Sequence, residues 1–311
     1  MCMTPLQILI AEKIIMLNSN ESFDLLVVAL NDNKKYKTYF ERVKKLCVNN
    51  LYYVQGKGRL VFFDYIRKLK SNNLNKKYDN YYLASIDSRH CQYILSKNKN
   101  SNIFTFDDGT ANIITSSLYY FNSKPSFLKR SGWRILGIKN YMKEIKEASL
   151  LHYTIYDGIP NIIDNKIYIS LVSKEKNIEQ KTSKVVSFYL GQPLTDISIS
   201  FDLPFVKKNI DKLKLDYYYP HPREVSYPEG KFQLIDNPLI FEDYIVQFLE
   251  KNPDVAVEVF SFTSTALLNI MSLDRVKVTY IYDAEFFELN HRFYEFTKET
   301  FGIPYLDLDS I

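Results

Sequence analysis

The sequence is poor in glycine and cysteine and has no long apolar run. Its nine glycines form neither a G-x-G-x-x-G pattern nor a P-loop, which argues against a dinucleotide-dependent enzyme or an NTPase. The three cysteines, Cys2, Cys47 and Cys91, are an odd number without zinc-ligand spacing. We therefore expect reduced thiols, no metal and a cytoplasmic protein. No apolar run approaches about 18 residues and no secretory signal is apparent, so any membrane contact should be peripheral.

Positive charge is slight and dispersed. Lys and Arg number 40 against 36 Asp and Glu, a net charge of +4. A nucleic-acid-binding protein usually concentrates basic residues on one face, so no nucleic-acid partner is predicted. A basic segment with the only tryptophan suits a membrane surface, but a solvated helix with Trp133 in the core explains it as well. The segment comprises Lys124, Lys129, Arg130, Trp133, Arg134, Lys139 and Lys143.

Short β-branched or aromatic runs alternate with helix-compatible segments, which is typical of an α/β protein with buried parallel strands. A chain of 311 residues favours two domains of roughly 150 residues each. Strands are predicted at 23–30, 51–54, 80–84, 102–106, 152–156, 184–190, 215–219, 256–262 and 276–282. Helices are predicted at 35–47, 60–72, 88–96, 125–150, 203–213, 240–251 and 264–272.

The polar stretch 170–183 has no apolar period and is the best linker candidate. We therefore predict an N-terminal Rossmann-like domain with its linker at 1–183 and a second Rossmann-like domain at 184–311. Two such halves suggest a GT-B arrangement with the active site in the cleft between them. Pro5 suits the first turn of a helix that continues to about Leu17. Such a helix normally follows a buried strand, so the numbering is expected to begin inside one.

The sharpest local motif is Phe106-Asp107-Asp108-Gly109-Thr110, which follows a predicted buried strand. Ligands of open α/β sheets bind beyond the carboxyl ends of the strands. Two carboxylates there can provide a general base for a substrate hydroxyl. A turn that ends the strand and caps the next helix would use the same residues, so both readings stay open.

His221-Pro222-Arg223 follows another predicted strand, where a histidine can donate a proton to a phosphate leaving group. Arg223 can contact an anion or simply pair with Glu224. His90 and His291 fall in helical stretches and are interpreted as structural, whereas His152 fits either role.

Three further segments place polar groups at strand ends or helix starts. Gly191 and Gln192 follow one strand, and Ser264 and Thr265 open a helix whose N-terminus can hold a phosphate. Ordinary N-capping explains Ser264 and Thr265 equally well. Glu242 opens another helix, a position that favours acidic residues in any case.

In order and spacing, these pieces resemble the bacterial lipooligosaccharide and capsule sialyltransferases of glycosyltransferase family 52. The resemblance spans nearly the whole chain. It rests on Thr4 to Gln7 with Ile10 to Ile14, Phe106 to Thr110, His152 to Tyr156, Leu190 to Pro193, Pro220 to Arg223, Phe241 to Ile245 and Ser261 to Ala266.

The resemblance implies a GT-B fold and inverting transfer of N-acetylneuraminic acid from CMP-N-acetylneuraminic acid to a terminal galactose, in α-2,3 linkage, without a metal. The acceptor would be a lipooligosaccharide or capsular glycan, and a homodimer is consistent with the family. His221 would be the general acid on the departing CMP phosphate, which Ser264 and Thr265 would bind. Glu242 would contact the cytidine.

The general base is less fixed by the resemblance. Related families use the first aspartate of Asp-Asp-Gly, here Asp107. Some members are thought to use an aspartate directly after Leu-Gly-x-Pro, where this chain has Leu194 and places Asp196 two residues later. We favour Asp107, with Asp196 as the alternative. Substrate-binding roles are expected for Asp108, Gly109, Gly191, Gln192, Arg223, Glu242, Ser264 and Thr265.

Two other functions remain open. A GT-B transferase with another nucleotide-sugar donor would favour extra Arg or Lys near the second-domain helix termini, where only Arg223 stands. An inactive glycan-binding protein could share the fold, although Asp107, His221 and Ser264 are all in place.

Overall fold

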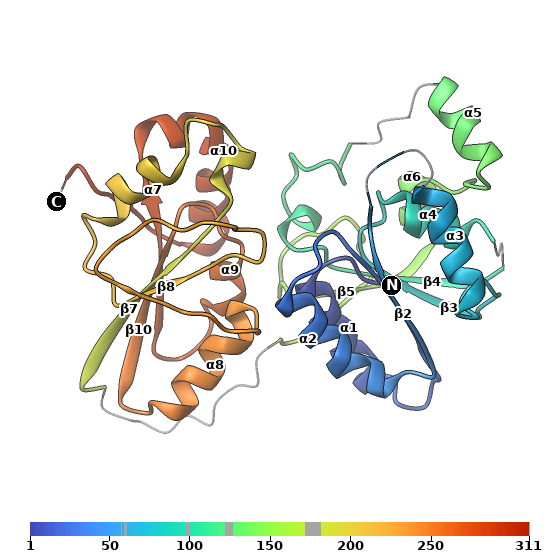
Figure 1. Ribbon diagram of the computed structural model, residues 1–311, viewed down its shortest axis with the longest axis horizontal. Helices are drawn as coiled ribbons and strands as arrows, with labels where there is room; N and C mark the ends of the chain where they lie inside the picture. Colours follow the sequence, from blue (N-terminus) through green and yellow to red (C-terminus); the bar gives the residue numbers. More distant parts are fainter. Residues whose placement is uncertain (57, 59–60, 98–99, 122–126, 172–181, 311) are drawn as a thin grey trace. The chain divides into compact units, whose positions relative to one another are not determined.

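The computed structural model describes residues 1–311 except 57, 59–60, 98–99, 122–126, 172–181 and 311 (Figure 1). It contains two compact units, Met1–Leu171 and Val172–Ile311. The boundary falls within the stretch 170–183 that the sequence marks as a linker, of which residues 172–181 lie outside the described residues. Both units consist of parallel strands and helices, which confirms the predicted α/β class. No helix in the described ranges is long and apolar enough to cross a membrane.

Unit 1 contains two parallel sheets. The first pairs β1 (Asp24–Ala29) with β2 (Asn49–Val54). The second has the order β3 (Asn80–Leu83), β4 (Asn102–Phe106), β5 (Ser149–Thr154) and β6 (Lys166–Tyr168). The helices are α1 (Pro5–Leu17), α2 (Lys34–Val43), α3 (Val61–Ser71), α4 (Arg89–Leu95), α5 (Phe127–Ile135) and α6 (Met142–Ala148).

The first residues of the chain bond to both sheets. Cys2 forms a parallel bridge to Val27 of β1, and the amino group of Met1 donates to the carbonyl of Tyr82 in β3 at 2.7 Å. Thr4 then caps α1 by accepting from the backbone N–H of Gln7 at 3.3 Å, and Pro5 takes the first helical position. This start places Gln7 at the carboxyl ends of the neighbouring strands.

The predicted helix over 125–150 is wrong. The chain forms α5 and α6 there, and β5 already begins at Ser149. Gly137, with φ +90°, ends α5: its N–H donates to the carbonyl of Arg134, and that of Ile138 donates to Trp133. This pair of bonds is a Schellman motif, which needs a left-handed residue after the helix. Within the basic segment, Lys124 lies outside the described residues.

Unit 2 has one six-stranded parallel sheet and four α-helices in the described ranges. The strand order is β12 (Tyr305–Asp307), β11 (Val276–Tyr282), β10 (Val255–Ser261), β7 (Lys184–Leu190), β8 (Tyr217–Tyr219) and β9 (Gln233–Leu234). The helices are α7 (Leu203–Ile210), α8 (Phe241–Lys251), α9 (Ala266–Ile270) and α10 (Ala284–Phe301). The predicted bounds of β7 and β11 are confirmed.

Aromatic side chains fill the core of unit 2. Phe188 of β7 is fully buried, and the rings of Phe262 and Phe286 lie with their centroids 4.8 Å apart. Burying one such side chain contributes about 1.5–3 kcal/mol to folding. The strands are therefore held firmly, and the loops that follow them start from fixed positions.

Candidate functional site

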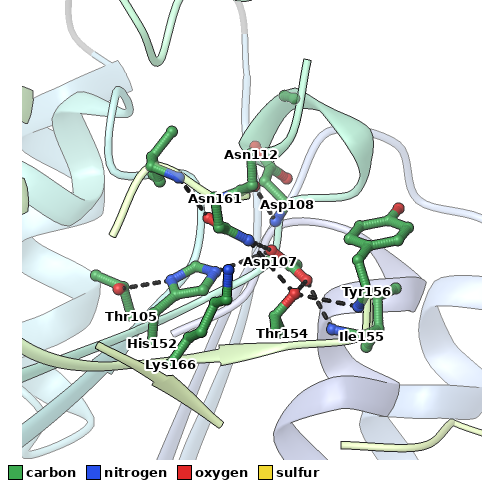
Figure 2. A network of polar contacts seen from close by, with 12 residues as sticks. Thr105, Asp107, Asp108, Asn112, His152, Thr154, Ile155, Tyr156, Asn161 and Lys166 are labelled. Carbon is green, nitrogen blue, oxygen red and sulfur yellow. Dashed lines mark hydrogen bonds and ion pairs between the residues drawn. The ribbon is translucent and has the colours of Figure 1, made fainter. Parts of the chain in front are cut away.

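Asp107, at the end of β4, lies at the centre of a buried hydrogen-bond network (Figure 2). Its Oδ1 atom lies 2.9 Å from Nε2 of His152 and accepts from the amide of Asn161 at 3.0 Å. Its Oδ2 atom accepts from the hydroxyl of Thr154 at 2.8 Å and the backbone N–H of Ile155 at 2.7 Å. The carboxylate thus joins β4, β5 and the loop after β5.

This geometry disfavours Asp107 as the general base. Asp107 and His152 each have 0% of their surface exposed, and both carboxylate oxygens are already engaged. His152 is tied on its other side, because Nδ1 lies 2.8 Å from the hydroxyl of Thr105. A base must reach the proton that it removes. Of the two readings of His152, the structural one fits.

Asp108, the next residue, has a different environment. It is partly exposed, and its Oδ1 accepts from the amide of Gln7 while Oδ2 accepts from the Tyr119 hydroxyl at 2.7 Å. Burial raises the pKa of the Asp108 carboxyl to about 6, and the nearby charge of Asp87 acts in the same direction. Gly109 follows with φ +90°, a conformation that side-chain-bearing residues rarely adopt. Asp108 is therefore the more accessible member of the Asp-Asp-Gly motif.

The Tyr119 hydroxyl lies between two carboxylates. It is 2.7 Å from Oδ2 of Asp108 and 3.0 Å from Oδ1 of Asp87. The amide of Gln7 also donates to the hydroxyl of Ser85, a residue with φ +44°. Sequence reasoning missed Tyr119 and Asp87, since no local pattern predicts that they converge on Asp108. The segment Thr4 to Gln7 contributes to the family resemblance, but the sequence assigns no role to Gln7.

In unit 2, the loops after β7 and β10 are joined by Gln192. Its Oε1 accepts from the Ser261 hydroxyl and from the backbone N–H of Thr263, both at 2.9 Å. Its Nε2 donates to the Thr263 hydroxyl at 3.3 Å. The strands β7 and β10 are neighbours in the sheet, but β8, which follows β7 in the sequence, lies on one side of the pair and β11, which follows β10, lies on the other. This is the topological switch point, where open α/β sheets bind ligands. Gln192 therefore holds the loops after β7 and β10 together at the switch point.

His221 lies just after β8, the strand next to β7. Its Nδ1 accepts the backbone N–H of Arg223 at 3.1 Å. The Arg223 guanidinium in turn lies 2.7 Å from the Asp196 carboxylate, so Arg223 pairs with Asp196 rather than with Glu224. The Asp196 side chain is 56% exposed. The structure thus brings together three predicted residues, His221, Arg223 and Asp196.

The remaining predicted residues follow β10 or lie on α8. Ser264 and Thr265 precede α9: Thr265 is the N-cap residue but makes no side-chain capping bond, and the Ser264 hydroxyl accepts from the N–H of Ala266 at 3.4 Å. Glu242, on α8, is 5% exposed and accepts from the amide of Asn269 at 2.8 Å. The contact of Glu242 fits a packing role, and the phosphate and cytidine roles stay predictions.

Among the described residues, no group of three or more His, Cys, Asp or Glu side chains is arranged to hold a metal ion.

Comparison with protein families adds an independent finding. The model of the family described as glycosyltransferase family 52 matches residues 20–284. That span includes the Asp-Asp-Gly motif, the histidine loop (His221 to Arg223) and the segment before α9.

Three curated relatives cover most of the chain. The chain is 35% identical over 271 residues to a CMP-N-acetylneuraminate:beta-galactoside alpha-2,3-sialyltransferase of Pasteurella multocida (strain Pm70), covering 87% of this chain and 86% of the relative. It is 31% identical to an N-acetyllactosaminide alpha-2,3-sialyltransferase of Haemophilus influenzae, with 90% of each chain covered. A protein of the same name from Neisseria meningitidis is 30% identical over 99% of this chain and 85% of its own.

Among solved structures, the chain is similar to MurG of Acinetobacter baumannii, with a TM-score of 0.45 and 8% identity. The match covers 99% of this chain and 82% of that one.

Proposed function

Because the chain belongs to glycosyltransferase family 52, we propose that it transfers N-acetylneuraminic acid from CMP-N-acetylneuraminic acid to a terminal galactose, in α-2,3 linkage with inversion. The observation that carries this proposal is the similarity over nearly the full length to relatives named as alpha-2,3-sialyltransferases. The loops after β7 and β8 support it, because they bring together His221, Arg223 and Asp196.

In the reaction, the galactose oxygen forms a bond to the anomeric carbon of sialic acid as the bond from that carbon to the CMP phosphate oxygen breaks. The transition state has oxocarbenium character, as in glycoside chemistry generally. A carboxylate takes the acceptor proton, and a donor stabilises the leaving phosphate on the opposite side. We assign His221 to the phosphate.

Asp196 fits the role of base better than Asp107 does. Its side chain is 56% exposed, and it pairs with Arg223, two residues from His221. Asp107 instead has 0% exposure and accepts four hydrogen bonds through its carboxylate. An exposed carboxylate beside the histidine loop can meet a sugar hydroxyl, whereas a sealed one cannot.

The donor would bind unit 2. Gly191 and Gln192 follow β7, where a nucleotide can lie against the loop that Gln192 braces. Ser264 and Thr265 would bind the phosphate, Arg223 would offset its charge and Glu242 would contact the cytidine. Asp108 and Gly109 belong to unit 1, where we place acceptor recognition.

The acceptor would be a lipooligosaccharide or capsular glycan that ends in galactose. A cytoplasmic location, peripheral membrane contact and a homodimer remain predictions.

The test is product analysis. The purified chain is incubated with CMP-N-acetylneuraminic acid and lactose, and the sialylated product is digested with an α-2,3-specific sialidase. Complete digestion is the expected result. A product that resists this enzyme but yields to a broad sialidase would contradict the linkage. Transfer from a UDP- or GDP-sugar instead would contradict the donor, and CMP binding without turnover would indicate an inactive glycan-binding protein.

A further inference from the structure

His221 to Glu224 form a tight turn. The backbone N–H of Glu224 donates to the carbonyl of His221 at 3.1 Å, the bond that closes a four-residue β-turn. Pro222 occupies the second position of this turn, for which its fixed φ is well suited. The sequence His-Pro-Arg-Glu therefore encodes the local backbone around the histidine.

The turn determines which ring nitrogen of His221 carries the proton. Nδ1 accepts the N–H of Arg223 at 3.1 Å, so Nδ1 has a lone pair at that point and the neutral ring carries its hydrogen on Nε2. Protonation of Nδ1 would set two N–H groups against each other. The ring is thus arranged as a neutral donor through Nε2.

Glu224 holds the turn from within. Its Oε2 accepts the backbone N–H of His221 at 2.6 Å, and its Oε1 accepts the hydroxyl of Tyr218 at 2.8 Å. Tyr218 is 1% exposed, and burial together with the carboxylate raises the pKa of its phenol well above the ordinary value. The phenol therefore remains a hydrogen-bond donor and anchors Glu224 to β8.

Gly191 completes this arrangement from the neighbouring loop. A Cβ atom added to Gly191 would overlap the Glu224 carboxylate oxygens and come within 2.8 Å of its carboxyl carbon. To avoid this overlap, the Glu224 carboxylate would have to give up its hydrogen bond with the N–H of His221 or with the Tyr218 hydroxyl. The absence of a side chain at Gly191 thus allows the carboxylate to reach the turn.

We propose that Glu224 positions His221 as a neutral hydrogen-bond donor, and that Nε2–H stabilises the departing phosphate without transferring its proton. The proposal rests on the proposed function. The acceptor proton moves to the base, the electron pair of the breaking C–O bond stays on the phosphate oxygen, and CMP leaves as a phosphate monoester. Such a group has a second pKa of about 6 and needs no proton at neutral pH. His221 keeps its Nε2 proton throughout this step. It passes that proton to none of the charged side chains around the turn, which are Glu224, Arg223 and Asp196.

The tautomer is measured directly. In protein labelled with ¹⁵N-histidine, two-bond ¹H–¹⁵N correlation spectra distinguish protonated from unprotonated ring nitrogens, and the signals lost in His221→Gln identify His221 among four histidines. We expect an unprotonated Nδ1 and a protonated Nε2 at pH 7.5 in the native chain. A protonated Nδ1 would overturn the proposal, whether or not the chain shows transferase activity.

Two variants from different loops should have the same effect. Glu224→Ala and Gly191→Ala should both give a mixture of His221 tautomers and lower kcat by about 10- to 100-fold, because small displacements at a reacting centre cost this much. In Glu224→Ala, KM for the donor should change less than about threefold. The exposed Glu229 provides the matched control, Glu229→Ala, which should change neither quantity. Unaltered tautomers in both variants would refute the positioning role.

His221→Gln separates hydrogen bonding from proton transfer. The glutamine amide can donate a hydrogen bond but cannot act as an acid, so it should retain at least about tenfold more activity than His221→Ala. Equal loss in the two variants, with transferase activity present in the native chain, would overturn the neutral-donor step while leaving the proposed function intact.

Discussion

Nε2 of His152 lies 2.9 Å from Oδ1 of Asp107, and neither side chain has any exposed surface. The pair lies between β4 and β5 and is completed by Thr105, Thr154 and Asn161. Because the pair is fully buried, its role is to hold β4 and β5 together. The motif that most resembles an active site in the sequence therefore divides into one structural and one accessible carboxylate.

Asp107→Ala should destabilise unit 1 severely. It removes one partner of a buried pair and leaves donors unpaired, which typically costs about 3–5 kcal/mol. Thermal unfolding monitored by circular dichroism measures the effect, with the exposed Asp157→Ala as control. A native melting temperature in Asp107→Ala would contradict the structural role.

The raised pKa of Asp108 makes the stability of unit 1 depend on pH. Its pKa is about 6 in the folded chain and near 3.8 in the unfolded chain, so between these values the folded state holds the extra proton. Folding stability should therefore fall as pH rises from about 4 to 6, by at most roughly 3 kcal/mol from this group.

Asp108→Asn removes this contribution. Urea unfolding measures the free energy of unfolding of the native chain and of the variant at pH 4.5 and pH 7. We expect this free energy, taken for the variant relative to the native chain, to be larger at pH 7 than at pH 4.5. A difference between the two proteins that does not vary with pH would contradict the assignment.

Gln192→Ala should weaken donor binding more than it slows chemistry. The change removes the bonds that join the loops after β7 and β10, so the proposed nucleotide site loses its brace. We expect CMP to bind about tenfold more weakly by isothermal titration calorimetry, since each lost bond is worth about 1 kcal/mol. Unchanged CMP affinity would place the nucleotide elsewhere.

Asp196→Asn should lower kcat by about 100-fold or more, while CMP affinity stays within threefold. General-base catalysis commonly contributes this much. The control is Asp211→Asn, which alters another exposed aspartate of unit 2 in an ion pair with Lys207. If Asp196→Asn keeps native turnover, the base must be another carboxylate, and Asp108 would be tested next.

The sequence predicts the regular elements of the fold well, because burial in a parallel sheet leaves a clear apolar signature. The strands at 102–106, 184–190 and 276–282 have the predicted bounds. The break at Gly137 was missed because basic and apolar residues continue a helical spacing through it. The strands β6, β9 and β12 have two or three residues each, too few to show an alternating pattern.

The site is harder to predict because its contacts join distant segments. The composition of His-Pro-Arg suggests an anion site, yet the pairing of Arg223 with Asp196 spans 27 residues. The role of Glu224 depends on the missing side chain at Gly191, and the difference between Asp107 and Asp108 depends on the residues of β5. Only the packed sheet brings these groups together.

The most direct test of the account measures CMP release from CMP-N-acetylneuraminic acid with and without lactose, for the native chain, His221→Ala and the exposed-histidine control His291→Ala. The account predicts lactose-dependent release by the native chain and the control, and a loss of about 100-fold or more in His221→Ala. Native release in His221→Ala, or no release with any galactoside, would contradict it.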